Sequence, residues 1–128
     1  MNALQSFAAP AGRVLISLIF IQSGWGKIAG YAGTQAYMES AGVPGFLLPL
    51  VIAVELLGGL AVLLGWQTRV AAFLLAGFTL LSALLFHFDF GDQGQTIQFM
   101  KNLAIAGGFL VIVAHGAGAW SIDARRGR

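Results

Sequence analysis

Cysteine is absent from this 128-residue sequence, and charged side chains make up only 9% of it. Without cysteine, the chain has no thiol nucleophile, no disulfide and no cysteine-ligated zinc or iron–sulfur site of its own. A soluble domain carries about 25% charged residues. A chain that is 58% hydrophobic has too few charges to form a polar shell in water. These deficits predict an integral membrane protein, and the length fits a single domain over residues 1–128.

Basic residues are scarce as well. The net charge is +2, and the one basic cluster is Arg125, Arg126 and Arg128 near the C-terminus. This distribution does not match a nucleic-acid-binding surface. The apolar run after Arg13 resembles the core of a signal peptide. It continues through Gln22 without a small-residue cleavage site, so we expect a retained first helix.

The sequence does contain four long apolar segments. We predict transmembrane helices over about Gly12–Gly30, Pro44–Gly65, Thr68–Phe88 and Thr96–His115. Each is close to the roughly 20 residues that cross a bilayer as a helix. Short connections favour antiparallel neighbours, so the predicted fold is an all-α membrane protein, an up-down-up-down four-helix bundle. The longest connection, Tyr31–Gly42, is predicted to contain a short helix at the membrane interface.

The arginines predict an orientation. Four spans put both termini on one side, and that side carries the five arginines Arg13, Arg69, Arg125, Arg126 and Arg128. Cytoplasmic loops of membrane proteins are enriched in arginine and lysine. We therefore expect both termini in the cytoplasm, with Lys27 and Lys101 toward the outer side.

The second apolar segment contains one carboxylate, Glu55, near its middle. At about 1.5 Å per residue from Phe46, Glu55 lies roughly 13 Å deep, close to the midplane of a bilayer. An ionised carboxylate facing lipid at that depth is costly, so Glu55 must face other helices. Buried charges are usually paired. We predict that the ammonium of Lys27 or Lys101 lies within hydrogen-bond reach of Glu55.

Polar residues from all four segments converge in the predicted outer half. They define a candidate pocket in which Glu55 and His87 would handle protons, and the residues that bind ligand would be Gln22, Lys27, Lys101 and Asn102. Simpler explanations stay open. Either lysine could extend to the headgroups, and Glu55 could be a structural tie between helices. His87 with Asp89 and Asp92 loosely resembles a metal site, but the spacing is not diagnostic, so we expect a solvated loop and no metal.

Three stretches, GWGKIAG, ELLGGLAVLLGWQTR and FMKNLAIAGGFLVIVAHGAGAWSIDARR, resemble the DoxX family of bacterial inner-membrane proteins. The resemblance covers about Arg13 to Arg126. It implies a four-helix protein of the bacterial inner membrane. It also implies a link to respiratory redox chemistry, because members of the family include the small subunit of an archaeal thiosulfate:quinone oxidoreductase and partners of oxidative-stress enzymes.

Nothing in the sequence reproduces the motif of a bound redox cofactor, such as a histidine pair for haem or a dinucleotide fingerprint. A redox role would therefore require a diffusible quinone or a catalytic partner. One hypothesis is a redox-associated subunit that binds a quinone or a small anion in the candidate pocket. The alternatives are a non-catalytic scaffold that tethers partner enzymes, or a small transporter, for which four spans leave little room unless the protein dimerises. Whether the chain is an enzyme, and whether it forms a homo-oligomer in the lipid, are left open.

Overall fold

The computed structural model describes residues 3–126, and these are folded entirely into helices and connections, without a strand. The elements are α1 (Ala3–Ala29), α2 (Tyr31–Ser40), the short 3-10 helix η1 (Gly45–Leu47), α3 (Leu48–Leu64), α4 (Thr68–Phe86), α5 (Gln93–His115) and α6 (Ile122–Arg125). Within the described part, four helical segments are long and apolar enough to cross a membrane: α1, η1 with α3, α4 and α5. The all-helical class and its four candidate spans are thus confirmed. The up-down arrangement across a bilayer and the location of α2 at the interface stay predictions.

Three helix boundaries differ from the predicted ones. α1 begins at Ala3 rather than Gly12 and continues through Pro10, because this stretch is rich in alanine, a strong helix former, and one proline removes a single backbone donor. α4 ends at Phe86 rather than Phe88, since His87 leaves the helical conformation. α5 begins at Gln93 rather than Thr96. The Asp92 carboxylate caps it by accepting hydrogen bonds from the two backbone N–H groups of Gly94 and Gln95.

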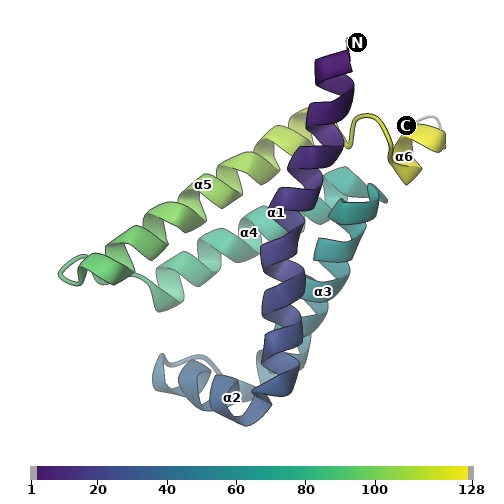
Figure 1. Cartoon of the computed structure of the whole chain (residues 1–128). Helices are drawn as coiled ribbons and strands as arrows, with labels where there is room; N and C mark the ends of the chain where they lie inside the picture. The colour runs from purple at the N-terminus through teal and green to yellow at the C-terminus, as the bar shows by residue number, and fades with distance from the viewer. Residues whose placement is uncertain (1–2, 127–128) are drawn as a thin grey trace.

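The long helices form two pairs (Figure 1). α1 packs against α3, α4 packs against α5, and α3 with α4 joins the pairs. Both termini lie at one end of the molecule, and α2 lies at the other. In this view the pairs meet near the termini and diverge toward α2.

The core lies where the two pairs meet. It consists of Phe20, Val62, Ala71, Ala72, Leu75, Ala76 and Phe109. The ring centroids of Phe20 and Phe109, from α1 and α5, are 5.4 Å apart. The outer surface is apolar as well, with large exposed side chains such as Leu57, Phe73 and Val111. So much exposed apolar surface suits contact with lipid.

Arg13 ties the terminal end of the molecule together. The residue is 2% exposed, and its guanidinium donates hydrogen bonds to five backbone carbonyls. Two of these acceptors, Val62 and Leu63, belong to the last turn of α3, where carbonyls lack an N–H donor four residues further along the helix. The Val62 carbonyl also accepts a 3.2 Å hydrogen bond from the Gly65 N–H. The other three belong to the segment after α5, at Ala117, Ala119 and Trp120. The sequence predicted correctly that Arg13 lies on the side of the molecule that carries both termini, but it did not predict these carbonyl acceptors.

Asp123 connects the C-terminal segment to the start of α4 at the same end of the molecule. Its carboxylate accepts hydrogen bonds from the backbone N–H groups of Gln67 and Thr68 and from the Thr68 hydroxyl, at 2.9, 2.8 and 2.6 Å. It therefore caps the first turn of α4 from a distant part of the chain. Gly65 must be glycine here, because its φ is +71° and a Cβ atom would lie 2.2 Å from that of Ser121. The fifth arginine of the predicted cytoplasmic set, Arg128, lies outside the described residues.

Candidate functional site

A cavity of about 400 Å³ lies between the two helix pairs, on the side of the core toward α2. Residues of α1, α2, α3, α4 and α5 line it, and most of them are aliphatic or aromatic. Its polar lining consists of Ser23, Lys27, Thr34, Tyr37, Glu55, Thr79, Ser82, His87, Gln98 and Asn102. Two of its apolar residues, Leu50 and Leu81, are 61% and 55% exposed, so the cavity reaches the outer, apolar surface of the helices.

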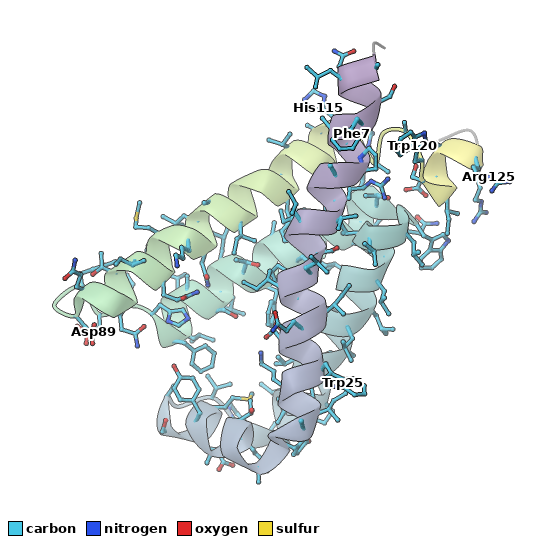
Figure 2. All side chains as sticks on the ribbon, in the orientation of Figure 1. Phe7, Trp25, Asp89, His115, Trp120 and Arg125 are labelled. Atoms are coloured by element: carbon cyan, nitrogen blue, oxygen red, sulfur yellow. The ribbon has the colours of Figure 1, made fainter. Side chains whose placement is uncertain are left out.

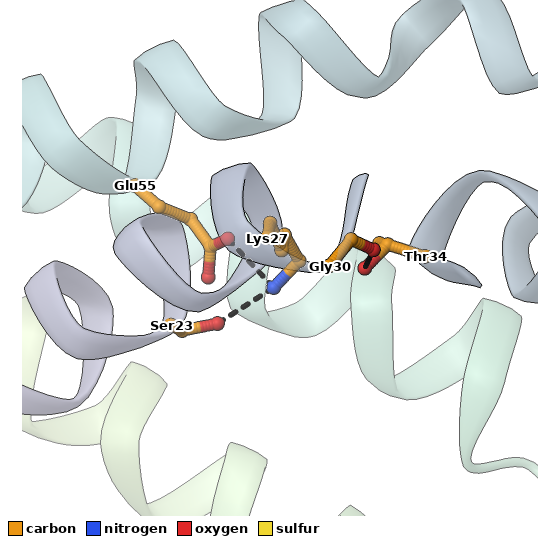
Figure 3. A network of polar contacts seen from close by, with 5 residues as sticks. All are labelled: Ser23, Lys27, Gly30, Thr34 and Glu55. Carbon is orange, nitrogen blue, oxygen red and sulfur yellow. Dashed lines mark hydrogen bonds and ion pairs between the residues drawn. The ribbon is translucent and has the colours of Figure 1, made fainter. Parts of the chain in front are cut away.

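An ion pair between α1 and α3 forms one wall of this cavity (Figure 3). The Lys27 Nζ atom lies 2.8 Å from Glu55 Oε1 and also donates a 2.6 Å hydrogen bond to the Ser23 hydroxyl. Glu55 is 4% exposed, and apart from this ion pair its Oε1 atom has no hydrogen-bond partner among the described residues. The ion pair is therefore what compensates the burial of the carboxylate. The predicted pairing of Glu55 with a lysine is confirmed, and the lysine is Lys27.

α1 and α3 can bring these groups together because Gly24 faces α3. A Cβ atom at this position would lie 2.7 Å from Leu56 Cγ and 3.3 Å from Glu55 Cβ. The absent side chain lets the two backbones approach closely. Lys27, three residues along the same face, then reaches Glu55.

Two further polar groups lie on the side formed by α4 and α5. Asn102 is buried and donates a 3.3 Å hydrogen bond to the Thr79 carbonyl, while its own side-chain oxygen accepts one from Gln98 at 3.1 Å. His87 follows α4, and its Nδ1 atom lies 2.6 Å from the side-chain oxygen of Gln95. Both line the cavity, as predicted from the sequence.

Two of the six predicted pocket residues lie elsewhere. Gln22 and Lys101 are exposed and do not line the cavity. Gln22 precedes Gly24 by two residues, or about 200° around the helix, so it points away when Gly24 contacts α3. Lys101 is about 100° from Asn102 around α5, and burial of Asn102 turns it outward. The expected pocket with two lysines is therefore wrong in this respect.

This correction changes the charge of the site. Among the described residues that line the cavity, Lys27 and Glu55 are the ones with a formal charge, and they are paired. Their formal charges cancel, so the lining has no net formal charge. The cavity is a largely apolar chamber with a neutralised ion pair on one wall and amide groups on the other.

Several lining residues were not predicted. Ser23 precedes Lys27 by four residues, and Gln98 precedes Asn102 by four, so helical spacing alone would have placed them beside the predicted residues. Tyr37 of α2 stacks on Phe86 of α4 with ring centroids 5.4 Å apart, and no sequence pattern connects these two. They close the end of the cavity beside α2.

The segment from His87 to Asp92 has ordinary structural contacts. Asp89 accepts a hydrogen bond from Gly91 N–H, Asp92 caps α5, and Figure 2 shows Asp89 at the far end of the α4–α5 pair. No three histidine or acidic side chains within residues 3–126 are grouped closely enough to hold a metal ion.

Comparison with known proteins gives a consistent result. The chain is 54% identical to the inner membrane protein YqjF of Escherichia coli (strain K12), over 96% of this chain and 95% of that protein. It is 38% identical to the inner membrane protein YphA of the same organism, over 98% and 100% of the two chains. A Bacillus subtilis (strain 168) protein named "putative oxidoreductase CatD" is 37% identical over 57% of this chain and 54% of its own length.

No solved structure matches this chain significantly. The DoxX family matches residues 8–88, which contain Lys27, Glu55 and His87, and this match covers more than half of the sequence. The relatives extend the similarity through α5, where Asn102 lies. The chain belongs to the DoxX family.

Proposed function

We propose that this DoxX-family inner-membrane protein binds a quinone in the cavity between its helix pairs, as a subunit associated with a redox enzyme. The observation that carries the proposal is the cavity itself: about 400 Å³, mostly apolar, without net charge, and lined by hydrogen-bond donors on two opposite walls. A quinone head group is a flat apolar ring with a carbonyl at each end. Ligand pockets of this kind are mainly apolar, with a few polar groups that fix orientation.

The polar groups suit the two carbonyls. The Lys27 ammonium can donate to one carbonyl while it remains paired with Glu55. On the opposite wall, the amides of Gln98 and Asn102 can donate to the other. Reduction of a quinone to a quinol takes up two electrons and two protons. In this proposal the partner enzyme supplies the electrons, and Glu55 and His87 relay the protons.

The route of entry follows from the exposed lining. Leu50 and Leu81 belong both to the cavity and to the apolar outer surface. A lipid-soluble quinone would then enter sideways from the bilayer. A small anion suits the cavity less well, because the one lysine in the lining is already neutralised by Glu55.

The proposed orientation completes this function. Arginines gather at the end that carries the termini, which favours both termini in the cytoplasm and an up-down passage of the four spans. α2 would then lie at the outer interface, and the cavity in the outer half of the membrane. The similarity to a protein named as an oxidoreductase supports a redox setting, although that similarity covers only part of both chains.

The experiment is a quinone-binding measurement on the purified full-length protein in nanodiscs, with ubiquinone-1 as the probe. Ser82 lies inside the cavity, whereas Leu84, two residues along α4, is 55% exposed and is not part of the lining. Ser82→Phe should fill the cavity and raise the Kd at least about tenfold, which corresponds to about 1.4 kcal/mol. Leu84→Phe adds the same ring to the lipid-facing surface and should leave the Kd unchanged. Equal affinity in the two variants, or no binding to the parent protein, would exclude the cavity as a quinone site.

The second candidate is a scaffold without a ligand. It is favoured by the position of the ion pair, which joins α1 to α3 as a structural tie would. The Glu55→Gln variant distinguishes it from the quinone site, as argued in the Discussion.

A further inference from the structure

Gln22 is a polar side chain on the outside of a transmembrane helix. It lies on α1, is exposed, and makes no hydrogen bond with any described residue. It points away from the cavity, so the proposed ligand site gives it no role.

The packing of α1 on α3 sets the depth of Gln22. A Cβ atom at Gly24 would contact Glu55 and Leu56, and one at Gly59 would contact Phe20 and Ile21. Gln22 is therefore level with the stretch between Glu55 and Gly59, which is the middle of α3 (Leu48–Leu64). When α3 crosses the membrane, the Gln22 amide lies within about one helical turn of the hydrocarbon centre.

An amide at that depth needs a partner. The hydrocarbon core contains no water to hydrogen-bond it, and an unpaired polar group there costs several kcal/mol. Glutamine side chains within membranes commonly hydrogen-bond across to another helix. Gln22 makes no hydrogen bond to another residue among 3–126, so we look for its partner in another molecule.

The residues around Gln22 form a continuous helical face. Leu15, Leu18, Gln22, Gly26 and Ala29 follow one another at spacings of three and four. Leu15 and Leu18 are 72% and 51% exposed, and a Cβ atom at Gly26 would have no neighbour within 4 Å. This face is uncharged and open, and Gly26 lets a second helix approach closely.

We propose that this face of α1 binds the same face of a second copy of the chain, with the two Gln22 amides hydrogen-bonded across a twofold axis. A primary amide carries both donors and an acceptor, so it is complementary to itself. A twofold interface requires that kind of self-complementarity, since each residue near the axis meets its own equivalent. The face carries no charge that would call for an oppositely charged partner protein. This interface is independent of the quinone proposal, because none of its five residues on α1 lines the cavity.

Cysteine cross-linking tests the pairing directly, because the natural sequence contains no cysteine and gives no background. Leu18→Cys places a thiol in the proposed interface, and Val111→Cys places one on α5 at 61% exposure. Full-length variants are oxidised in the membranes of the expressing cells. Leu18→Cys should give a disulfide-linked dimer, and Val111→Cys should stay monomeric. Equal cross-linking of both, no cross-linking of Leu18→Cys, or its attachment to a different protein would overturn the proposal.

A second measurement tests the amide itself. In liposomes, Gln22→Leu should weaken dimerisation of the full-length protein about three- to thirty-fold, the range expected for an interhelical hydrogen bond in a membrane. Gln22→Asn keeps an amide and should retain most of the association. Both variants should unfold in detergent at the temperature of the parent protein, which shows that each is folded. Parent-like dimerisation of Gln22→Leu would show that the amide does not hold the interface.

Discussion

Gly24 of α1 lies directly against Glu55 of α3: a Cβ atom on the glycine would be 3.3 Å from the Cβ of the glutamate and 2.7 Å from Leu56 Cγ. This close approach brings Lys27 to the buried carboxylate. The spacing between α1 and α3 therefore determines whether the ion pair can form.

We predict that Gly24→Val destabilises the protein. Its branched side chain would press on Leu56 and separate the helices, at a cost of about 1–3 kcal/mol for overpacking. Gly12→Val is the matched control on the same helix, because no atom lies within 4 Å of a Cβ at Gly12. Thermal unfolding in detergent measures the difference. A Gly24→Val protein as stable as Gly12→Val would contradict the close packing of α1 on α3.

Arg13 gives a second prediction, at the terminal end. Arg13→Lys keeps the positive charge but cannot reproduce the planar fork that donates to five carbonyls, two on α3 and three on the segment after α5. Each buried carbonyl left without a partner costs about 1–3 kcal/mol. We expect a clear fall in the unfolding temperature and faster proteolysis after α5. Arg125→Lys, an exchange at an exposed position, should change neither.

A third prediction concerns orientation. Arg13 contacts Ala119, Arg69 lies beside Gly116, and Arg125 and Arg126 end α6, so these four arginines lie at the end that carries both termini (Figure 2). Arginine is enriched on the cytoplasmic side of membrane proteins. A reporter fused after the last residue should be active in the cytoplasm, and one inserted at Gly91, between α4 and α5, should be active outside. The reverse result would move the cavity to the cytoplasmic leaflet and the arginines to the outside.

The sequence predicted the positions of some site residues correctly and those of others incorrectly. The pairing of Glu55 with a lysine followed from the cost of burying charge, which holds whatever the details of packing. The placement of Gln22 and Lys101 failed because it depends on how each helix is rotated. A difference of one residue turns a side chain by about 100°, and apolar residues surround these helices on every side. The true rotation is set by contacts such as Gly24 against Leu56, which no periodic pattern in a membrane helix reveals.

The hydrogen bonds of Arg13 and Asp123, at the end of the molecule that carries both termini, were not predicted for another reason. The acceptors of Arg13 are backbone carbonyls, and those have no signature in the residue types that carry them. Asp123 likewise caps α4 from 55 residues away. The glycine-rich stretch between α5 and Asp123 is a weak signal, because two of its glycines, Gly116 and Gly118, have positive φ angles. It indicates a sharply folded segment but not its partners.

The last prediction separates a ligand site from a scaffold at Glu55. Glu55→Gln is nearly isosteric, and its amide oxygen can still accept a hydrogen bond from Lys27. The Lys27 side chain is 25% exposed, against 5% for Glu55, so losing the opposite charge costs Lys27 less than it would cost the buried carboxylate. We therefore expect the unfolding temperature to change little. Lys27→Met, by contrast, removes the partner and leaves Glu55 buried alone, which should cost several kcal/mol unless the carboxyl takes up a proton.

We expect the Glu55→Gln substitution to affect function more strongly than stability. If the cavity couples quinone reduction to proton uptake, the amide of Glu55→Gln cannot transfer a proton, and quinone-linked activity with the redox partner should fall by about a hundredfold or more, the usual contribution of general acid–base catalysis. Binding of ubiquinone-1 should largely persist, since the cavity keeps its shape and Lys27 its ammonium. The two assays, unfolding temperature and quinone-linked turnover, are made on the same preparation. If Glu55→Gln is as active as the parent, Glu55 is a tie between α1 and α3, and the scaffold is the better description of this protein.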